Sequence, residues 1–84
     1  MSLMGSTGSL TDTIRAAIIA DIPDADVEVH GTGGHFTIRV VSTAFAGKSL
    51  LAKRRLVMSA VAPFMKGDDA PVHAIDRLET LSPE

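Results

Sequence analysis

The chain has 84 residues and no cysteine; 45% of its residues are hydrophobic and 21% are charged. This length supports one domain with a small core, and this composition excludes a disordered chain. Without cysteine there is no disulfide framework, which is compatible with a reducing compartment, so we expect a cytoplasmic protein. The apolar runs are too short to span a membrane, and a formal charge of −2 argues against general binding to phosphate backbones.

Residues 1–9, MSLMGSTGS, are small and polar and contain a second methionine at Met4. This composition is typical of a flexible leader that is partly vector-derived. We therefore take residues 10–84 as the folded domain.

The first predicted element is a helix that stops before Pro23, because proline cannot continue a helix. Either Ser9 or Thr11 can cap its N-terminus. Its apolar residues recur at helical spacing on one side: Leu10, Ile14, Ala17 and Ile18.

From Asp26 the pattern changes to an alternation with a period of two, which predicts a β-hairpin with one buried face. The residues expected on that face are Val27, Val29, Phe36, Ile38 and Val40. The loop is expected to have four residues, Gly31 to Gly34. His30 and His35 flank it, so they should stand directly opposite each other on the other face, with Cβ atoms about 5 Å apart.

A turn with a buried Phe45 leads to a longer helix from about Ser49 to the region of Pro63. Lys66 and Gly67 make a plausible C-terminal cap for it. Its apolar side is expected to be the main contribution to the core: Leu50, Val57, Met58, Val61, Phe64 and Met65.

The final segment, VHAIDRL, has strand character with a less regular alternation. The order is therefore α-β-β-turn-α-β. The connection between the second and third strands is long enough for a parallel crossover, which predicts a mixed three-stranded sheet with helices on one face.

Basic residues gather at the start of the second helix. Lys53, Arg54 and Arg55 fan around it at about 100° per residue, with Arg55 and Lys48 on the solvent side and Arg54 near the apolar stripe. Aromatic residues make up only 4% of the chain, which leaves few groups to stack on bases. A solvated helix face is the favoured interpretation, and contact with nucleic acid or a partner is the alternative.

The three histidines are candidate metal ligands. His73 lies in the last predicted strand in phase with Arg77, so we expect it to face the same way as His30 and His35. Two imidazoles at this spacing can hold one borderline metal, and exposed polar side chains are the alternative interpretation. Iron–sulfur centres usually take thiolates, so here another molecule would supply sulfur. No catalytic constellation is recognisable, and we expect no enzyme.

The segments GGHFTIRVVSTAFAGKSLLAKRRLV and APVHAIDRLETLSPE resemble the BolA-like family of stress-induced morphogens. The resemblance covers about residues 24–83, and the combination of segments is specific. It implies a single small α/β domain of the class II KH-like type, with the order α-β-β-α-α-β and a three-stranded mixed sheet.

The resemblance implies a non-enzymatic adaptor that pairs with a monothiol glutaredoxin and glutathione. The two proteins would share a 2Fe–2S cluster in iron–sulfur cluster trafficking or iron regulation. His73 matches the family's ligand in the Val-His-Ala strand. The second ligand would be His30, which is nearest to the loop entry and is favoured, or His35, at the family's His-Phe position, which is not always the ligand.

The basic residues Lys48, Lys53, Arg54 and Arg55 would then lie on or near the partner surface. The alternative that the resemblance implies is a DNA-binding transcriptional regulator of stress response and cell morphology that uses this KH-like basic helix. The chain departs from the family's Arg-His-Arg and Leu-Val-Tyr patterns, and Leu50 replaces the second glycine of a Gly-x-x-Gly clamp. A weak homodimer is a further state that the sequence leaves open.

Overall fold

The computed structural model describes residues 9–83, so most of the expected leader lies outside the described part. The elements follow in the order α1 (Leu10–Asp21), β1 (Asp26–Thr32), β2 (His35–Val41), η2 (Thr43–Phe45), α2 (Leu50–Val61), η3 (Ala62–Phe64) and β3 (Ala74–Leu81). The predicted α/β order is confirmed. Where the resemblance implied an additional helix between β2 and α2, the chain forms only the single 3₁₀ turn η2.

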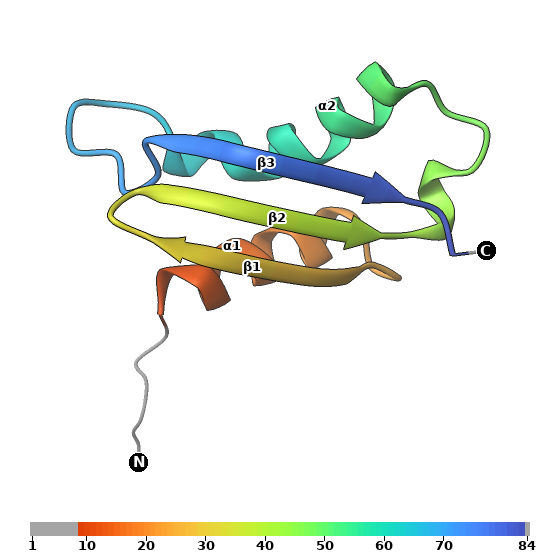
Figure 1. Ribbon diagram of the computed structural model, residues 1–84, viewed down its shortest axis with the longest axis horizontal. Helices are drawn as coiled ribbons and strands as arrows, with labels where there is room; N and C mark the ends of the chain where they lie inside the picture. The colour runs from red at the N-terminus through yellow and green to blue at the C-terminus, as the bar shows by residue number, and fades with distance from the viewer. Residues whose placement is uncertain (1–8, 84) are drawn as a thin grey trace, which may run out of the picture.

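The three strands form one mixed sheet in the order β1-β2-β3, as predicted. β1 pairs with β2 antiparallel, and β2 pairs with β3 in parallel. Both helices lie behind one face of the sheet (Figure 1). On the open face Arg39 of β2 lies 3.8 Å from Glu28 of β1 and 3.5 Å from Glu79 of β3, so one guanidinium spans all three strands. No helix among residues 9–83 is long and apolar enough to cross a membrane.

The core lies between the sheet and the two helices. The buried hydrophobic residues are Ile14, Ile18, Ile22, Val27, Phe36, Ile38, Val40, Phe45, Val57, Ala60, Val61, Val72 and Leu78. The expected core position of Leu50 is wrong, because its side chain is 63% exposed. Only the C-terminal turns of α2 pass behind β3, whereas its first turn projects past the edge of the sheet (Figure 1).

The helix ends follow local sequence signals. Ser9 caps α1 by accepting a hydrogen bond from the backbone of Asp12, and Ser49 caps α2 by accepting one from Ala52. α2 stops at Val61, and Pro63 lies in the 3₁₀ turn η3 that follows, as the prediction for Pro63 required. The expected C-terminal cap at Lys66 and Gly67 is wrong, because the cap of α2 is Ala62, whose N–H donates to Met58.

The β1–β2 loop is shorter than the sequence suggested. Gly33 and Gly34 have φ angles of 62° and 84°, and the residues that flank them, Thr32 and His35, form a pair. Positive φ at both central residues is the requirement of a two-residue type I′ turn, whose twist lets the strands continue up to it. His30 therefore pairs with Thr37. His30 and His35 share a face but are diagonal neighbours, which places their Cα atoms roughly 7–8 Å apart instead of directly opposed.

Hydrogen bonds to the Asp24 carboxylate link the α1–β1 connection to the turn after β2. The carboxylate accepts hydrogen bonds from the hydroxyls of Ser42 and Thr43 and, at 2.9 Å, from the backbone N–H of Thr43. The side-chain hydrogen bonds from Ser42 and then Thr43 are the main reasons that the pKa of Asp24 falls from its ordinary 3.8 to about 2. These bonds favour the ionised carboxylate, so they stabilise the fold only while Asp24 is charged.

We expect Asp24→Asn to lower the midpoint of thermal unfolding at pH 7 and to lose this effect in acid. The folded pKa is below the unfolded one, so the contribution is complete above about pH 4 and is lost as the pH falls toward 2. Thermal unfolding followed by circular dichroism between pH 7 and pH 2.5 measures the difference. Asp21→Asn is the control, because Asp21 is also exposed and is not a partner in the hydrogen bonds to Ser42 and Thr43. A difference that stays constant with pH would contradict the assignment.

Candidate functional site

Two of the three histidines meet at one end of the sheet. His35 is the first residue of β2, and His73 immediately precedes Ala74, the first residue of β3 and the partner of His35 in the parallel ladder. The two ring centroids are 6.5 Å apart and the ring planes make an angle of 70°. His73 was expected within the strand, but it lies one residue before it.

The β1–β2 turn holds His73 in place. The backbone N–H groups of His73 and Ala74 both donate to the carbonyl of Gly34, at 2.8 and 3.0 Å. The imidazole of His73 packs directly over Gly34, so a Cβ at that glycine would lie 2.8 Å from Cγ of the ring. The missing side chain of Gly34 therefore makes the space that the His73 ring occupies.

A β-bulge brings a carboxylate to His35. Phe36 pairs with Ile75 and Thr37 pairs with Arg77, so Asp76 is an extra residue in β3. Such a bulge turns two successive side chains to one side, and Asp76 and Arg77 are both exposed. Nδ1 of His35 lies 3.2 Å from Oδ1 of Asp76. The sequence predicts that His73 and Arg77 face the same way, because they are four residues apart in an alternating strand. The extra residue Asp76 interrupts that alternation, so this prediction is wrong.

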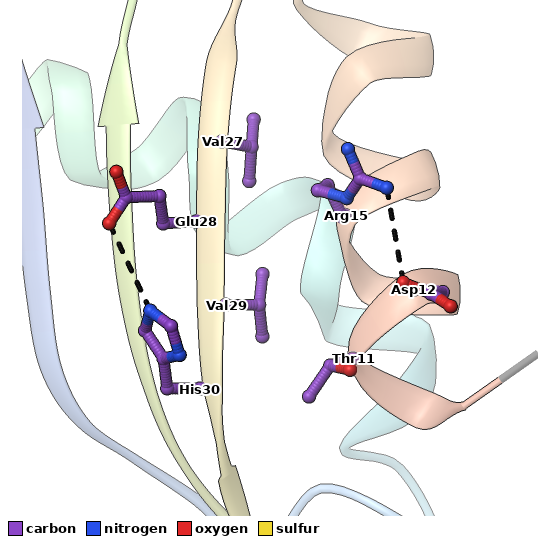
Figure 2. Close-up of a pocket in the computed structure, with 7 residues that line it drawn as sticks. All are labelled: Thr11, Asp12, Arg15, Val27, Glu28, Val29 and His30. Atoms are coloured by element: carbon purple, nitrogen blue, oxygen red, sulfur yellow. Dashed lines mark ion pairs between the residues drawn. The ribbon is translucent and has the colours of Figure 1, made fainter.

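His30 lies away from this pair, on the outer strand β1. Figure 2 shows Val27 and Val29 pointing toward α1, whereas Glu28 and His30 point away from it, as the alternation predicted. Nε2 of His30 is 3.9 Å from Oε1 of Glu28. Because β2 separates β1 from β3, His30 is farther from His73 than His35 is.

The His35–His73 pair has a spacing that suits one metal ion. With metal–nitrogen bonds of about 2.1 Å, two imidazoles on a single ion have ring centres roughly 5–6 Å apart, slightly less than the 6.5 Å found here. Both rings are on the surface, so a small rotation closes the difference. No group of three or more histidine, aspartate or glutamate residues suited to a metal occurs among residues 9–83. The pair thus offers two nitrogen ligands and leaves the remaining positions to another molecule.

The basic residues form no single cluster. Arg54 Nη1 donates to the carbonyl of Leu78 at 3.3 Å, which fixes this side chain against β3 near the core, where the helical wheel placed it. Lys48 and Arg55 line a shallow hollow with Leu56, and Lys53 is half-buried. The start of α2 and the histidine pair lie toward opposite ends of the sheet (Figure 1).

Two features of the surface were not expected from the sequence. Leu50, Leu51 and Leu56 of α2 expose 63%, 59% and 37% of their surface, and of these Leu56 lines the hollow with Lys48 and Arg55. The helical periodicity predicts a buried Leu50, so its exposure is a difference from the sequence pattern. Asp76 also escaped notice. The irregular alternation of VHAIDRL was the one signal of the bulge that turns it toward His35.

Most of the chain matches a known protein family. Residues 14–84 match the family described as BolA-like protein. A protein of Acinetobacter guillouiae described as an uncharacterized protein in the rpoN-murA intergenic region is 32% identical over 66 residues, or 79% of this chain and 72% of that protein.

Solved structures agree with this match. A BolA protein homologue from Coxiella burnetii is 29% identical with a TM-score of 0.71, covering 92% of this chain and 94% of that one. BolA1 from Arabidopsis thaliana has a TM-score of 0.75 and covers 92% and 95%, and at 19% identity it supports the fold alone. From the match over residues 14–84 it follows that the chain is a member of the BolA-like protein family.

Proposed function

We propose that this chain is a non-enzymatic adaptor that pairs with a monothiol glutaredoxin and glutathione and shares a 2Fe–2S cluster with them. Membership of the BolA-like family supports the class of function. The observation that carries the proposal is the His35–His73 pair, held at 6.5 Å on a chain without cysteine. When bound, the cluster would supply iron and sulfide for transfer and one-electron redox chemistry.

The ligand types fit this cluster. In Rieske-type 2Fe–2S centres two histidines hold one iron and two cysteine thiolates hold the other. Here His35 and His73 would supply both nitrogens, while a glutaredoxin cysteine and the glutathione thiol would supply both sulfurs. Neither protein then completes the centre alone, which is the reason to expect a shared site.

The geometry favours His35 over His30 as the second ligand. His35 adjoins β3 at the residue that pairs with Ala74, next to His73, whereas His30 belongs to the outer strand and its ring tip faces Glu28. Gly34 contributes by leaving space for the His73 ring, and its carbonyl fixes the backbone of His73. The work of this chain is thus to hold two imidazoles in place.

The proposal is tested by titrating the protein into a cluster-loaded monothiol glutaredoxin and recording visible absorption and circular dichroism. We expect the cluster spectrum to change and to saturate near one chain per glutaredoxin. His35→Ala is expected to raise the concentration at half-saturation at least about 10-fold, and His30→Ala to leave it nearly unchanged. An unchanged spectrum with the unmodified protein would refute the function, and the reverse order of the two variants would move the second ligand to His30.

The alternative function is a DNA-binding transcriptional regulator that uses α2. It is favoured by Lys48 and Arg55, which line one hollow on the solvent side of the helix. Against it stands the net charge of −2. DNA binding that falls steeply with salt and is lost in Arg55→Glu would support this alternative.

A further inference from the structure

We propose that Asp76 selects the tautomer of His35, so that Nδ1 carries the proton and Nε2 keeps a free electron pair for the iron. This inference deepens the proposed function and rests on it for its purpose. The contact itself belongs to the free chain: Nδ1 of His35 lies 3.2 Å from Oδ1 of Asp76.

The protonation of the two nitrogens follows from the nature of the partner. An ionised carboxylate accepts hydrogen bonds and cannot donate one, so a neutral imidazole that bonds to it must place its proton on the nearer nitrogen. For His35 that nitrogen is Nδ1. A neutral imidazole has one protonated and one unprotonated nitrogen, and Nε2 is then left able to bind a metal.

The bulge in β3 is the structural device behind this contact. Phe36 pairs with Ile75 and Thr37 pairs with Arg77, so Asp76 has no pairing partner in β2. Metal-bound histidines commonly donate their second N–H to a carboxylate, which orients the ring and raises its basicity. Asp76 would be such a positioning residue for His35.

The other candidate ligand has the opposite arrangement. The carboxylate near His30 is that of Glu28, and it lies 3.9 Å from Nε2. At this distance the two groups make no hydrogen bond, and the carboxylate is on the side of the ring opposite to that in His35. Of the two histidines, only His35 has a carboxylate within hydrogen-bond distance of a ring nitrogen, and that nitrogen is Nδ1.

The test is made on the free chain, without metal or partner. Long-range ¹H–¹⁵N correlation spectra of the ¹⁵N-labelled protein, at a pH at which the imidazoles are neutral, distinguish protonated from unprotonated ring nitrogens. We expect His35 to be mainly the Nδ1–H form. Asp76→Ala is expected to shift it to the Nε2–H form that free histidine favours, and Asp76→Asn, which keeps the size of the side chain, to weaken the preference. Glu28→Gln is the control and should leave His35 unchanged.

Wild-type His35 with a protonated Nε2, or the same tautomer in the wild type and in Asp76→Ala, would overturn the inference. Amide spectra of each variant establish that it is folded. A second readout is the glutaredoxin titration, in which Asp76→Ala should raise the half-saturation concentration about 10-fold. If the tautomer is as expected but the wild type leaves the cluster spectrum unchanged, the proposed function fails and the tautomer assignment stands. If the wild type binds and Asp76→Ala binds equally well, the positioning role fails.

Discussion

Gly31→Ala is expected to be the most damaging single substitution at the histidine end of the sheet. Gly31 has a φ of 152°, and a Cβ there would overlap the backbone oxygen of His35 and lie 2.8 Å from Cα of Phe36. Because both contacts are with backbone atoms of the paired strand, relief requires that β1 and β2 separate. We expect a loss of about 3 kcal/mol or more, against a total stability of about 4–13 kcal/mol for a domain of this length.

Urea denaturation followed by far-ultraviolet circular dichroism measures this loss. Gly33→Ala is the matched control, two residues away in the same hairpin. Gly33 also has a positive φ, 62°, but a Cβ there meets no atom within 4 Å. It should therefore lose only the cost of the left-handed backbone, about 1–2 kcal/mol. Equal losses for the two variants would show that the steric contacts of Gly31 have been misjudged.

His73→Ala is expected to have the largest effect on the shared cluster. Loss of an outer-shell partner commonly costs 10- to 100-fold in metal affinity, so loss of a ligand should weaken the complex by at least about 100-fold. The fold should change little, because His73 is exposed and the hydrogen bonds to Gly34 come from the backbone. Titration with cluster-loaded glutaredoxin measures the affinity, and urea denaturation of the same variant measures the stability.

His30→Ala supplies the control for the loss of an exposed histidine. If His73→Ala leaves the affinity for the cluster-loaded glutaredoxin unchanged, His73 is not a ligand. If His73→Ala and His30→Ala weaken the complex equally while His35→Ala does not, His30 replaces His35 as the second ligand. If His73→Ala instead unfolds the chain, His73 is a structural residue of the turn, and its assignment as a ligand loses support.

The sheet and its helices could be predicted because the pattern of the sequence is strong there. Val27, Phe36, Ile38 and Val40 alternate with polar residues, and each of them is buried. Pro63 and Ser49 mark the two ends of the second helix by their own chemistry. These signals are local, so they do not depend on how the elements meet.

The details of the site depend on contacts between elements and were less accessible. The sequence predicts a loop of four residues, Gly31 to Gly34, although the pair Gly33-Gly34 is itself a signal of a two-residue turn. That error set His30 and His35 in direct opposition. The bulge at Asp76 arises from how β3 fits against β2 and has no short motif. Leu50 continues the apolar periodicity of α2, but its exposure depends on where the helix meets the sheet, which periodicity does not contain.

The two surfaces of the molecule are separate. The histidine pair occupies the end of the sheet at which β2 and β3 begin, and α2, which carries Arg55, begins toward the other end (Figure 1). A change at Arg55 should therefore leave the environment of His35 and His73 unaltered. The cluster function and the DNA-binding alternative can be tested independently by mutation.

The central claim is that histidines of this chain bind iron in a centre shared with glutaredoxin. The most direct measurement is pulsed electron paramagnetic resonance of the reduced complex, with ¹⁵N-labelled histidine in this chain only. We predict couplings from two directly bound ¹⁵N nuclei, of which one disappears in His73→Ala and the other in His35→Ala. A reduced cluster in the mixture with no strongly coupled ¹⁵N would contradict the account.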